Sequence, residues 1–207
     1  MNLRKRLRLY VITDRRLKPE IESVREALEG GATAIQLRIK NAPTKEMYEV
    51  GKEIRRLTTE YGALFFVDDR IDVALAVDAD GVQLGPEDMP IKVAKEIAPN
   101  LIVGASVYSL EEAVRAEKEG ADYLGAGSVF PTKTKKDVKV IGIKGLRRIV
   151  ENVKIPVVAI GGINIENARE VLRTGVAGIA VISAVMGAEN VRKATEELRK
   201  IVEEVLR

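Results

Sequence analysis

Short apolar runs rich in Val, Ile and Leu recur along the chain, and most are followed by a longer stretch of helical period. These runs predict eight strands, at residues 7–13, 34–39, 63–67, 81–84, 101–104, 123–125, 157–160 and 178–182. Helical stretches lie between them, among them residues 20–29, 45–60, 110–119, 144–152, 165–173 and 191–206. Strand and helix therefore alternate throughout the chain.

Strands that are apolar on both faces are typical of a parallel sheet covered by helices. Glycines at helix-to-strand junctions, such as residues 30–32 and 120–122, suit helix C-termini. Eight repeats favour closure of the sheet over an open doubly wound sheet, so we predict an α/β fold, a single (β/α)8 TIM barrel. No linker or low-complexity segment divides the chain, and residues 1–207 are expected to form one domain.

Composition narrows the chemistry that such a barrel could perform. The chain has no Cys and no His, which excludes disulfides, a thiolate nucleophile and Cys-containing zinc sites. Any metal would be a hard cation held by oxygen, and proton transfer would fall to carboxylate, Lys, Tyr, Ser, Thr, substrate or water.

Charge and hydropathy indicate neither a nucleic-acid nor a membrane partner. Basic and acidic residues nearly balance at 34 and 31, aromatic residues make up 4%, and no basic stripe follows a predicted helix, so we expect no nucleic-acid binding. No apolar run reaches the roughly 18 residues of a membrane-spanning helix, and the early run at 9–12 is too short for a signal peptide. We therefore expect a cytoplasmic protein without membrane contact, and the sequence leaves a homo-oligomer open.

The predicted second strand alternates strictly between apolar and polar residues. Its apolar side, which should meet the helices, consists of Ile35, Leu37 and Ile39. Its polar side consists of Gln36, Arg38 and Lys40. In a closed barrel this polar side points inward near the mouth, where two cations are costly to bury without an anionic ligand. The alternative is an edge strand with a solvated face, which barrel closure disfavours.

Carboxylates follow two neighbouring strands. The third predicted strand ends in Asp68 and Asp69, and Asp88 comes just beyond the fourth. Adjacent strands could thus present Asp69 and Asp88 to one ion, and Mg²⁺ prefers one or two carboxylates together with waters and substrate phosphates. The alternative for each residue is a helix N-cap.

Three segments after later strands suit phosphate. Residues 127–137 form a Gly- and Pro-containing loop with clustered hydroxyl and ammonium groups, although a solvated surface loop would have the same composition. Gly161 and Gly162 follow the seventh strand, and Ile182 and Ser183 follow the eighth and open a helix. Barrels often bind phosphate with the loops after these two strands. The sequence therefore predicts phosphorylated ligands.

Six segments, in this order, resemble the thiamine-phosphate synthases: YVITD at 10–14, QLRIK at 36–40, DDR at 68–70, GPED at 85–88, FPTKTKK at 130–136 and IGGI at 160–163. The resemblance covers about residues 7–187. It implies an enzyme, a transferase that joins a pyrimidine diphosphate to a thiazole phosphate with Mg²⁺ as cofactor and releases pyrophosphate. The diphosphate would leave first, and the thiazole nitrogen would capture the resulting pyrimidine carbocation.

The same resemblance assigns the site residues. The pyrimidine diphosphate would be held by Gln36, Arg38, Lys40, Asp68, Ser106 and Lys135. The thiazole phosphate would be held by Thr132, Lys133, Thr134, Gly162, Ile182 and Ser183. Asp69 and Asp88 would bind Mg²⁺, and the residues expected to act in catalysis are Arg38, Lys40, Ser106 and Lys135.

Four positions, among them Pro86 and Ser128, depart from the family pattern, and other barrels remain as alternatives. Asp68 stands where the family often has Asn, and Gln83 stands where it usually has His. A thiazole tautomerase of this fold is associated with an acid/base histidine, which this chain lacks. Other phosphate-binding barrels explain Gly161 and Gly162 but not the two aspartates. A non-catalytic barrel that binds thiamine phosphate would differ from the enzyme only in turnover.

Overall fold

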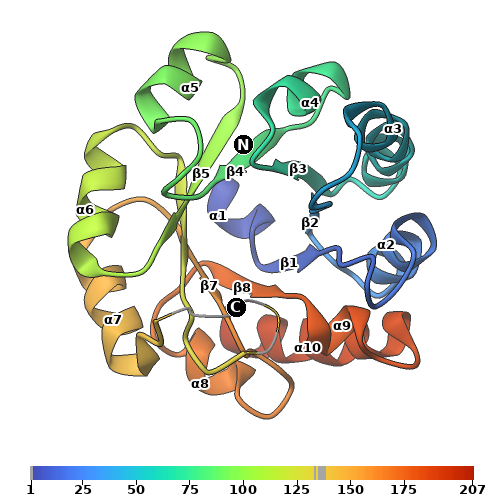
Figure 1. Ribbon diagram of the computed structural model, residues 1–207. Coiled ribbons are helices and arrows are strands. Elements are labelled where there is room, and N and C mark those ends of the chain that lie inside the picture. The colour runs from blue at the N-terminus through green and yellow to red at the C-terminus, as the bar shows by residue number, and fades with distance from the viewer. Residues whose placement is uncertain (1, 133, 135–138) are drawn as a thin grey trace.

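The computed structural model describes residues 2–132, 134 and 139–207, and its strands form a closed parallel barrel (Figure 1). The strands are β1 (Leu9–Ile12), β2 (Ala34–Leu37), β3 (Leu64–Asp68), β4 (Gly81–Leu84), β5 (Ile102–Val107), β6 (Tyr123–Ala126), β7 (Val157–Ile160) and β8 (Gly178–Val181). Each strand pairs with the next, and β8 pairs with β1. The predicted (β/α)8 barrel is confirmed.

Helices surround this barrel as an outer ring. The longer ones are α2 (Glu20–Glu29), α3 (Thr44–Glu60), α6 (Leu110–Lys118), α7 (Gly142–Asn152) and α10 (Val191–Val205). Shorter ones are α4 (Ile71–Ala76), α5 (Ile91–Ile97), α8 (Ala168–Leu172) and α9 (Ser183–Met186). A further short helix, α1 (Leu3–Arg6), lies within the ring of strands in Figure 1, and Leu3 packs against the barrel interior. In the described residues no helix is both long and apolar enough to cross a membrane.

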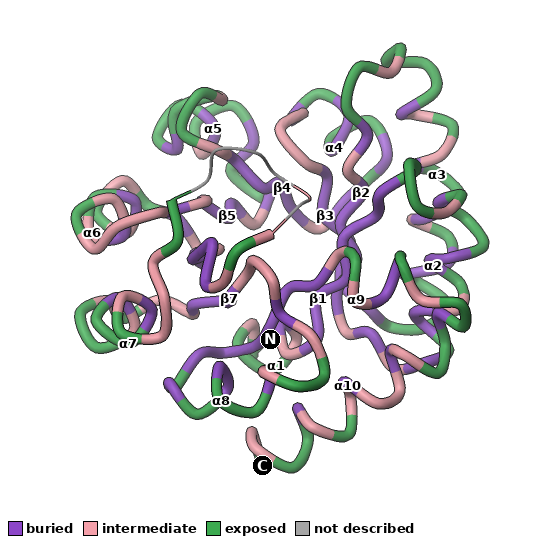
Figure 2. Tube along the Cα trace, turned by 60° about the horizontal axis from the view of Figure 1, so that its bottom comes forward, coloured by how far each residue is buried: buried purple, intermediate pink, exposed green. Residues whose placement is uncertain are grey.

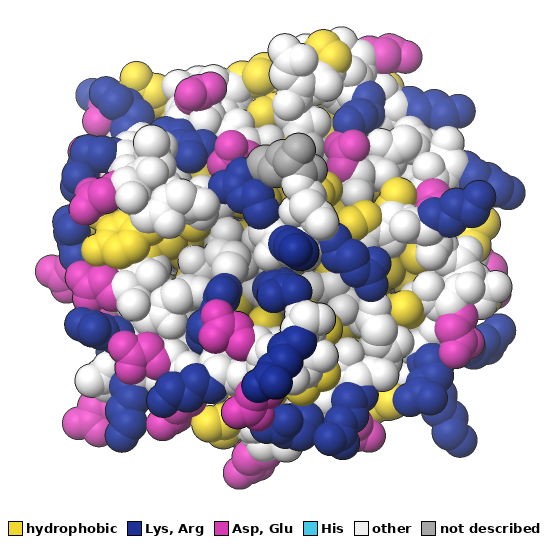
Figure 3. Space-filling view, turned by 180° about the vertical axis from the view of Figure 1, so that it is seen from behind, with side chains coloured by type: hydrophobic (Ala, Val, Ile, Leu, Met, Phe, Trp, Pro, Cys, Tyr) yellow, Lys and Arg dark blue, Asp and Glu magenta, His cyan; other side chains and the backbone are white. Residues whose placement is uncertain are grey.

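Two apolar layers hold the fold together. The outer layer lies between strands and helices and includes Ile35, Leu37 and Phe65, as the alternation of β2 predicts. The inner layer fills the barrel and includes Leu64, Phe66 and two tyrosines. Figure 2 shows the consequence, with buried strands at the centre and helices that are exposed on their outer sides. From the side opposite to Figure 1, positive and negative side chains are interspersed over the surface (Figure 3).

The structure corrects several predicted boundaries. Strand β5 continues to Val107 instead of ending at residue 104, because Ala105 and Val107 keep pairing with β6. Helix α8 begins only at Ala168, because the side chain of Asn164 accepts hydrogen bonds from the amides at 166 and 167 and holds a turn there. The helices α1, α4, α5 and α9 were not singled out by periodicity, since they span no more than seven residues.

Barrel closure depends on a small residue at the start of β8. A Cβ atom on Gly178 would overlap backbone atoms of Leu7 and Arg8, which lead into β1. Backbone in a closed sheet cannot move away, so this position admits no side chain.

We expect Gly178→Ala to lower the free energy of unfolding by about 1 to 3 kcal/mol, because an overpacked core or sheet costs that amount. Urea denaturation would measure it. The matched control is Gly145→Ala in α7, where a Cβ would approach only the side chain of Ile141 and helix propensity favours alanine. Equal stability of the two variants would contradict the importance of close packing at the β1–β8 seam.

Candidate active site

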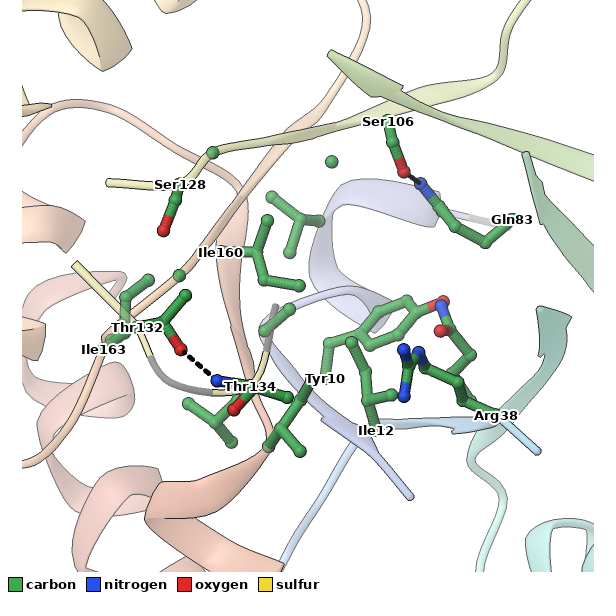
Figure 4. A pocket seen from close by; sticks show the side chains of 18 of the residues that line it. Tyr10, Ile12, Arg38, Gln83, Ser106, Ser128, Thr132, Thr134, Ile160 and Ile163 are labelled. Atoms are coloured by element: carbon green, nitrogen blue, oxygen red, sulfur yellow. Dashed lines mark hydrogen bonds between the residues drawn. The ribbon is translucent and has the colours of Figure 1, made fainter. Parts of the chain in front are cut away.

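A pocket opens at the carboxyl ends of the strands, where barrel enzymes place their sites. It is lined by residues that come from both halves of the barrel, with Arg38 and Gln83 on one side and Ser128, Thr132 and Ile163 on the other (Figure 4). Of the predicted site residues, the pocket brings together Gln36, Arg38, Asp68, Ser106, Thr132, Thr134, Gly162, Ile182 and Ser183. Segments far apart in the sequence therefore meet at one mouth.

Strand β2 delivers its polar side chains into this mouth. Gln36 is buried and donates a hydrogen bond from Nε2 to the hydroxyl of Tyr10 at 2.9 Å. The backbone of Arg38 is held by Thr13, whose hydroxyl accepts its amide hydrogen at 2.9 Å. In the part of the chain that the structure describes, Arg38 Nε is a buried nitrogen without a hydrogen-bond partner, and Asp68 Oδ2 lies 3.7 Å away. A buried guanidinium donor left in this way fits an anionic ligand.

Carboxylates gather on the same side of the mouth. Asp69 adopts a left-handed backbone with a φ of 64°, which turns the chain directly after β3. Its carboxyl group lies within hydrogen-bonding distance of that of Asp88, so the predicted pairing of the two residues is present. Asp88 is held in a tight turn, because its Oδ2 accepts a hydrogen bond from the amide of Gly85 at 2.6 Å. Lys40 bridges Asp68, at 2.9 Å, and Asp69.

The pKa values reflect this crowding of like charges. Burial raises the pKa of Asp88 to about 6, with a further contribution from Asp69. Burial and the charge of Asp69 likewise raise the pKa of Asp68. Burial lowers the pKa of Lys40, but the attraction of Asp68 and the hydrogen bond to Asp69 outweigh it, so the net pKa is raised. Three carboxylates thus face two cations, and the excess of negative charge favours a further cation.

The other half of the mouth is built from loops. Gly161 and Gly162 have φ values of 105° and 64°, so the loop after β7 takes a left-handed path that glycine allows. A Cβ on Gly162 would lie 2.7 Å from the carbonyl oxygen of Pro131, which shows how closely the loops after β6 and β7 pack. Thr132 accepts a hydrogen bond from the amide of Thr134 at 3.2 Å (Figure 4). The predicted residues Lys133 and Lys135 lie outside the described residues.

An ion pair between a buried carboxylate and an exposed arginine borders these loops. Asp14 is buried and receives three hydrogen bonds from Arg16, whose side chain is 64% exposed. The guanidinium hydrogen bond lowers the pKa of Asp14. Both residues line a second hollow, which also borders Thr132, Gly162 and Ser183. In the sequence, Asp14 entered only through the segment at 10–14 that carries the resemblance, and the structure shows that it holds Arg16 in place.

The floor of the pocket contains buried polar residues to which the sequence assigned no role in the site. Tyr10, Gln83 and Tyr123 are buried there and form hydrogen bonds with each other and with Gln36 and Ser106. Tyrosines in short strands are ordinarily interpreted as core. The available signal was their position at alternate, inward-facing places on β1 and β6.

The fold and the mouth together define a (β/α)8-barrel enzyme for phosphorylated ligands. A family model described as thiamine monophosphate synthase matches residues 9–185. The chain is 85% identical over 206 residues to the thiamine-phosphate synthase of Pyrococcus furiosus and 52% identical over 207 residues to that of Methanococcus maripaludis, with 100% of each chain covered in both cases. A solved thiamine phosphate pyrophosphorylase from Pyrococcus furiosus superposes with a TM-score of 0.97 at 83% identity, covering 100% of both chains.

More distant barrels share the fold alone. A 3-hexulose-6-phosphate synthase superposes with a TM-score of 0.67 at 21% identity, covering 94% of this chain and 99% of the other. By contrast, the identity to the thiamine-phosphate synthases of Pyrococcus furiosus is above 80% over the full length of the chain. The chain belongs to the thiamine-phosphate synthase family, and it is a transferase.

Arg38 Nε, which donates no hydrogen bond to any described residue, generates a prediction about anion binding. Arg38→Met keeps the apolar stem and removes the charge, so we expect inorganic pyrophosphate to bind about 10- to 100-fold more weakly, the loss of one or two charged hydrogen bonds. Isothermal titration calorimetry would measure the dissociation constant. Arg55→Met is the matched control, because Arg55 is similarly half-buried but pairs with Asp80 on the outside of the barrel. Unchanged affinity in Arg38→Met would show that Arg38 does not face the anion.

Proposed function

We propose that the mouth binds the pyrimidine diphosphate on the side of β2 to β5 and the thiazole phosphate on the side of β6 to β8. The chain would then join the two rings into thiamine phosphate and release pyrophosphate. The observation that carries this proposal is the buried Nε of Arg38, which has no hydrogen-bond partner among the described residues and lies 3.7 Å from Asp68, the neighbour in sequence of the Asp69 that pairs with Asp88. A cationic donor and a pair of carboxylates on the same side of the mouth suit a metal-bound diphosphate.

The residues at the mouth fit Mg²⁺. Asp69 and Asp88 bring two carboxylates together at one point, and Lys40 offsets only part of their negative charge. Among the described residues no group of three or more acidic side chains could hold a metal ion alone. This suits Mg²⁺, which is usually held by one or two carboxylates plus waters and substrate phosphates. When bound, Mg²⁺ would supply charge stabilisation for the diphosphate.

The proposed reaction is a dissociative substitution. The C–O bond between the pyrimidine methylene and the diphosphate breaks, and its electron pair leaves with the diphosphate. The thiazole nitrogen then donates its lone pair to the methylene carbon and forms the new C–N bond. No protein nucleophile takes part. Arg38 and Lys40 donate hydrogen bonds to the departing oxygens, Lys135 is predicted to do the same from the loop after β6, and Ser106 and Gln36 hold the ring.

The loops of the other half would hold the second substrate. Gly162 has no side chain, so a ligand can approach its backbone closely. Ser183 begins α9 directly after β8, so amide hydrogens at both Gly162 and Ser183 can face a phosphate group. Thr132 and Thr134 add hydroxyl groups next to them. Binding at two separate places on one mouth would bring the nitrogen of one ring to the methylene of the other.

The direct test mixes the protein with both substrates and Mg²⁺ and follows thiamine phosphate and pyrophosphate. We expect Asp69→Asn to lower kcat/KM by at least about 100-fold, since electrostatic groups at a departing charge contribute that much. Its thermal stability should not fall, because the variant relieves repulsion from Asp68 and Asp88.

Asp72→Asn is the control for this substitution. Asp72 lies three residues further on, in α4, pairs with Arg70 at 2.6 Å, and has a side chain that is 61% exposed. It should retain full activity, and chelation of Mg²⁺ with EDTA should stop the wild type. Product formation by Asp69→Asn at the wild-type rate, or turnover that persists in EDTA, would contradict the proposed metal site.

A further inference from the structure

A continuous chain of hydrogen bonds crosses the floor of the pocket. Gln36 Nε2 donates to Tyr10 Oη at 2.9 Å, and the hydroxyls of Tyr10 and Tyr123 lie 3.0 Å apart. Tyr123 Oη donates to Gln83 Oε1 at 2.6 Å. Gln83 Nε2 in turn donates to Ser106 Oγ at 3.0 Å, as the dashed line in Figure 4 shows. The chain links β1, β2, β4, β5 and β6, and both of its ends are residues that we place at the pyrimidine substrate.

The direction of every hydrogen bond in this chain follows from counting protons. Tyr123 has one hydroxyl proton and gives it to Gln83, so Tyr10 must be the donor in the pair of tyrosines. With its own proton committed, Tyr10 can only accept from Gln36, which is the bond observed. One amide, that of Gln83, therefore sets the polarity of the whole chain.

Each end of this hydrogen-bond chain presents one polar group that can bind a ligand. No described residue donates a hydrogen bond to Gln36 Oε1, so that oxygen is an acceptor for a ligand. Ser106 Oγ accepts from Gln83, and no described residue accepts the proton of Ser106, so this hydroxyl is a donor for a ligand. The pocket thus offers an acceptor at one end and a donor at the other.

The barrel reserves space for this arrangement. A Cβ on Gly104 would overlap both Gln83 Oε1 and Tyr123 Cζ, and a Cβ on Gly125 would lie 3.0 Å from Gln83 Nε2. Both tyrosine rings pack on Phe66, at centroid distances of 5.3 Å and 5.4 Å, which leaves them no room to turn. Burial raises the pKa of both tyrosines, so both hydroxyls keep their protons at physiological pH.

We propose that Tyr123 and Gln83 are positioning residues that orient the Gln36 amide and the Ser106 hydroxyl, and that they thereby select an amino-substituted pyrimidine ring over its oxo analogue. The inference rests on the proposed function, which places Gln36 and Ser106 at that ring. The 4-amino group is a donor and matches Gln36 Oε1. A 4-oxo group would place its own lone pair against the lone pair of Gln36 Oε1. A buried mismatch between two acceptors of this kind lowers the affinity for the ligand strongly.

The chain also prevents the mismatch from being relieved. Rotation of the Gln36 amide would present its NH₂ group to a 4-oxo ligand, but it would turn Oε1 towards Tyr10, which has no proton to give. Tyr123→Phe frees the Tyr10 proton, because its acceptor is gone. The Gln36 amide could then adopt either orientation, and discrimination between the two rings should fall.

The test compares dissociation constants of the 4-amino pyrimidine diphosphate and its 4-oxo analogue, by isothermal titration calorimetry with Mg²⁺ and without the thiazole phosphate. We expect the wild type to prefer the amino ring by at least about 100-fold and Tyr123→Phe to reduce this preference by about 10-fold. Gln83→Met, which is close in volume and removes the amide, should have the same effect. Affinity for inorganic pyrophosphate should not change in either variant.

Tyr48→Phe is the matched control. Tyr48 lies on α3 outside the barrel, and the substitution also removes one phenol hydroxyl. It should leave the preference unchanged. A lower melting temperature with an unchanged preference in both Tyr123→Phe and Gln83→Met would overturn the inference and leave a purely structural role.

A double-mutant cycle separates this inference from the proposed function. If Tyr123 acts through Gln36, Tyr123→Phe should reduce the preference for the amino ring by about 10-fold in the wild type and by less than about 2-fold in Gln36→Ala. If the wild type turns over but the effects of Tyr123→Phe and Gln36→Ala are additive, the inference is contradicted and the proposed function is not. Absence of turnover in the wild type would instead refute the proposed function.

Discussion

Parallel closure of the sheet is the constraint on which the rest of the molecule depends. The pairing of β8 with β1 leaves no edge, so every second side chain of every strand must point into one enclosed space. All strands run the same way, and their carboxyl ends therefore meet at one mouth. An inward polar residue such as Gln36 or Arg38 has no other surface on which to be solvated. The chemistry of the mouth follows from this geometry.

Within the mouth the two halves carry different groups. The side of β2 to β5 holds the buried donor of Arg38, the Lys40 bridge and the paired carboxylates of Asp69 and Asp88. The side of β6 to β8 relies on backbone and hydroxyl groups around Gly162 and Thr132. This asymmetry suits two substrates of different charge, one metal-bound diphosphate and one phosphate monoester. Between them lies a neutral floor of tyrosine and glutamine side chains, which we propose sets the shape and polarity of the ring site.

The barrel could be predicted from the sequence because each strand and each longer helix shows its pattern within a short segment of the chain. Short apolar strands that alternate with helical stretches gave all eight strands, and the alternation of β2 correctly placed Gln36 and Arg38 inward. The short helices α1, α4 and α5 were not singled out, because two turns are too few for a period to show. Ser106 was expected just after a strand, whereas it lies within β5, since continued pairing with β6 is a tertiary effect.

The site was predictable in its charges and not in its hydrogen bonds. Asp69 and Asp88 could be paired in advance, because adjacent parallel strands end side by side. The link from Tyr10 through Tyr123 to Gln83 could not, because it joins strands far apart in sequence across the barrel interior. Nothing in the residue types distinguishes a tyrosine that fills the core from one that directs a proton. Only the distances between the side chains do so.

The central claim is that one mouth holds a divalent cation with the diphosphate on the β2 to β5 side. Crystals of the protein grown with Mn²⁺ and inorganic pyrophosphate would test it most directly through anomalous diffraction from the metal. We predict an anomalous peak in contact with the carboxylates of Asp69 and Asp88, with a pyrophosphate oxygen within reach of Arg38. A metal bound elsewhere in the barrel, or pyrophosphate seated on the β6 to β8 side without the metal, would contradict it.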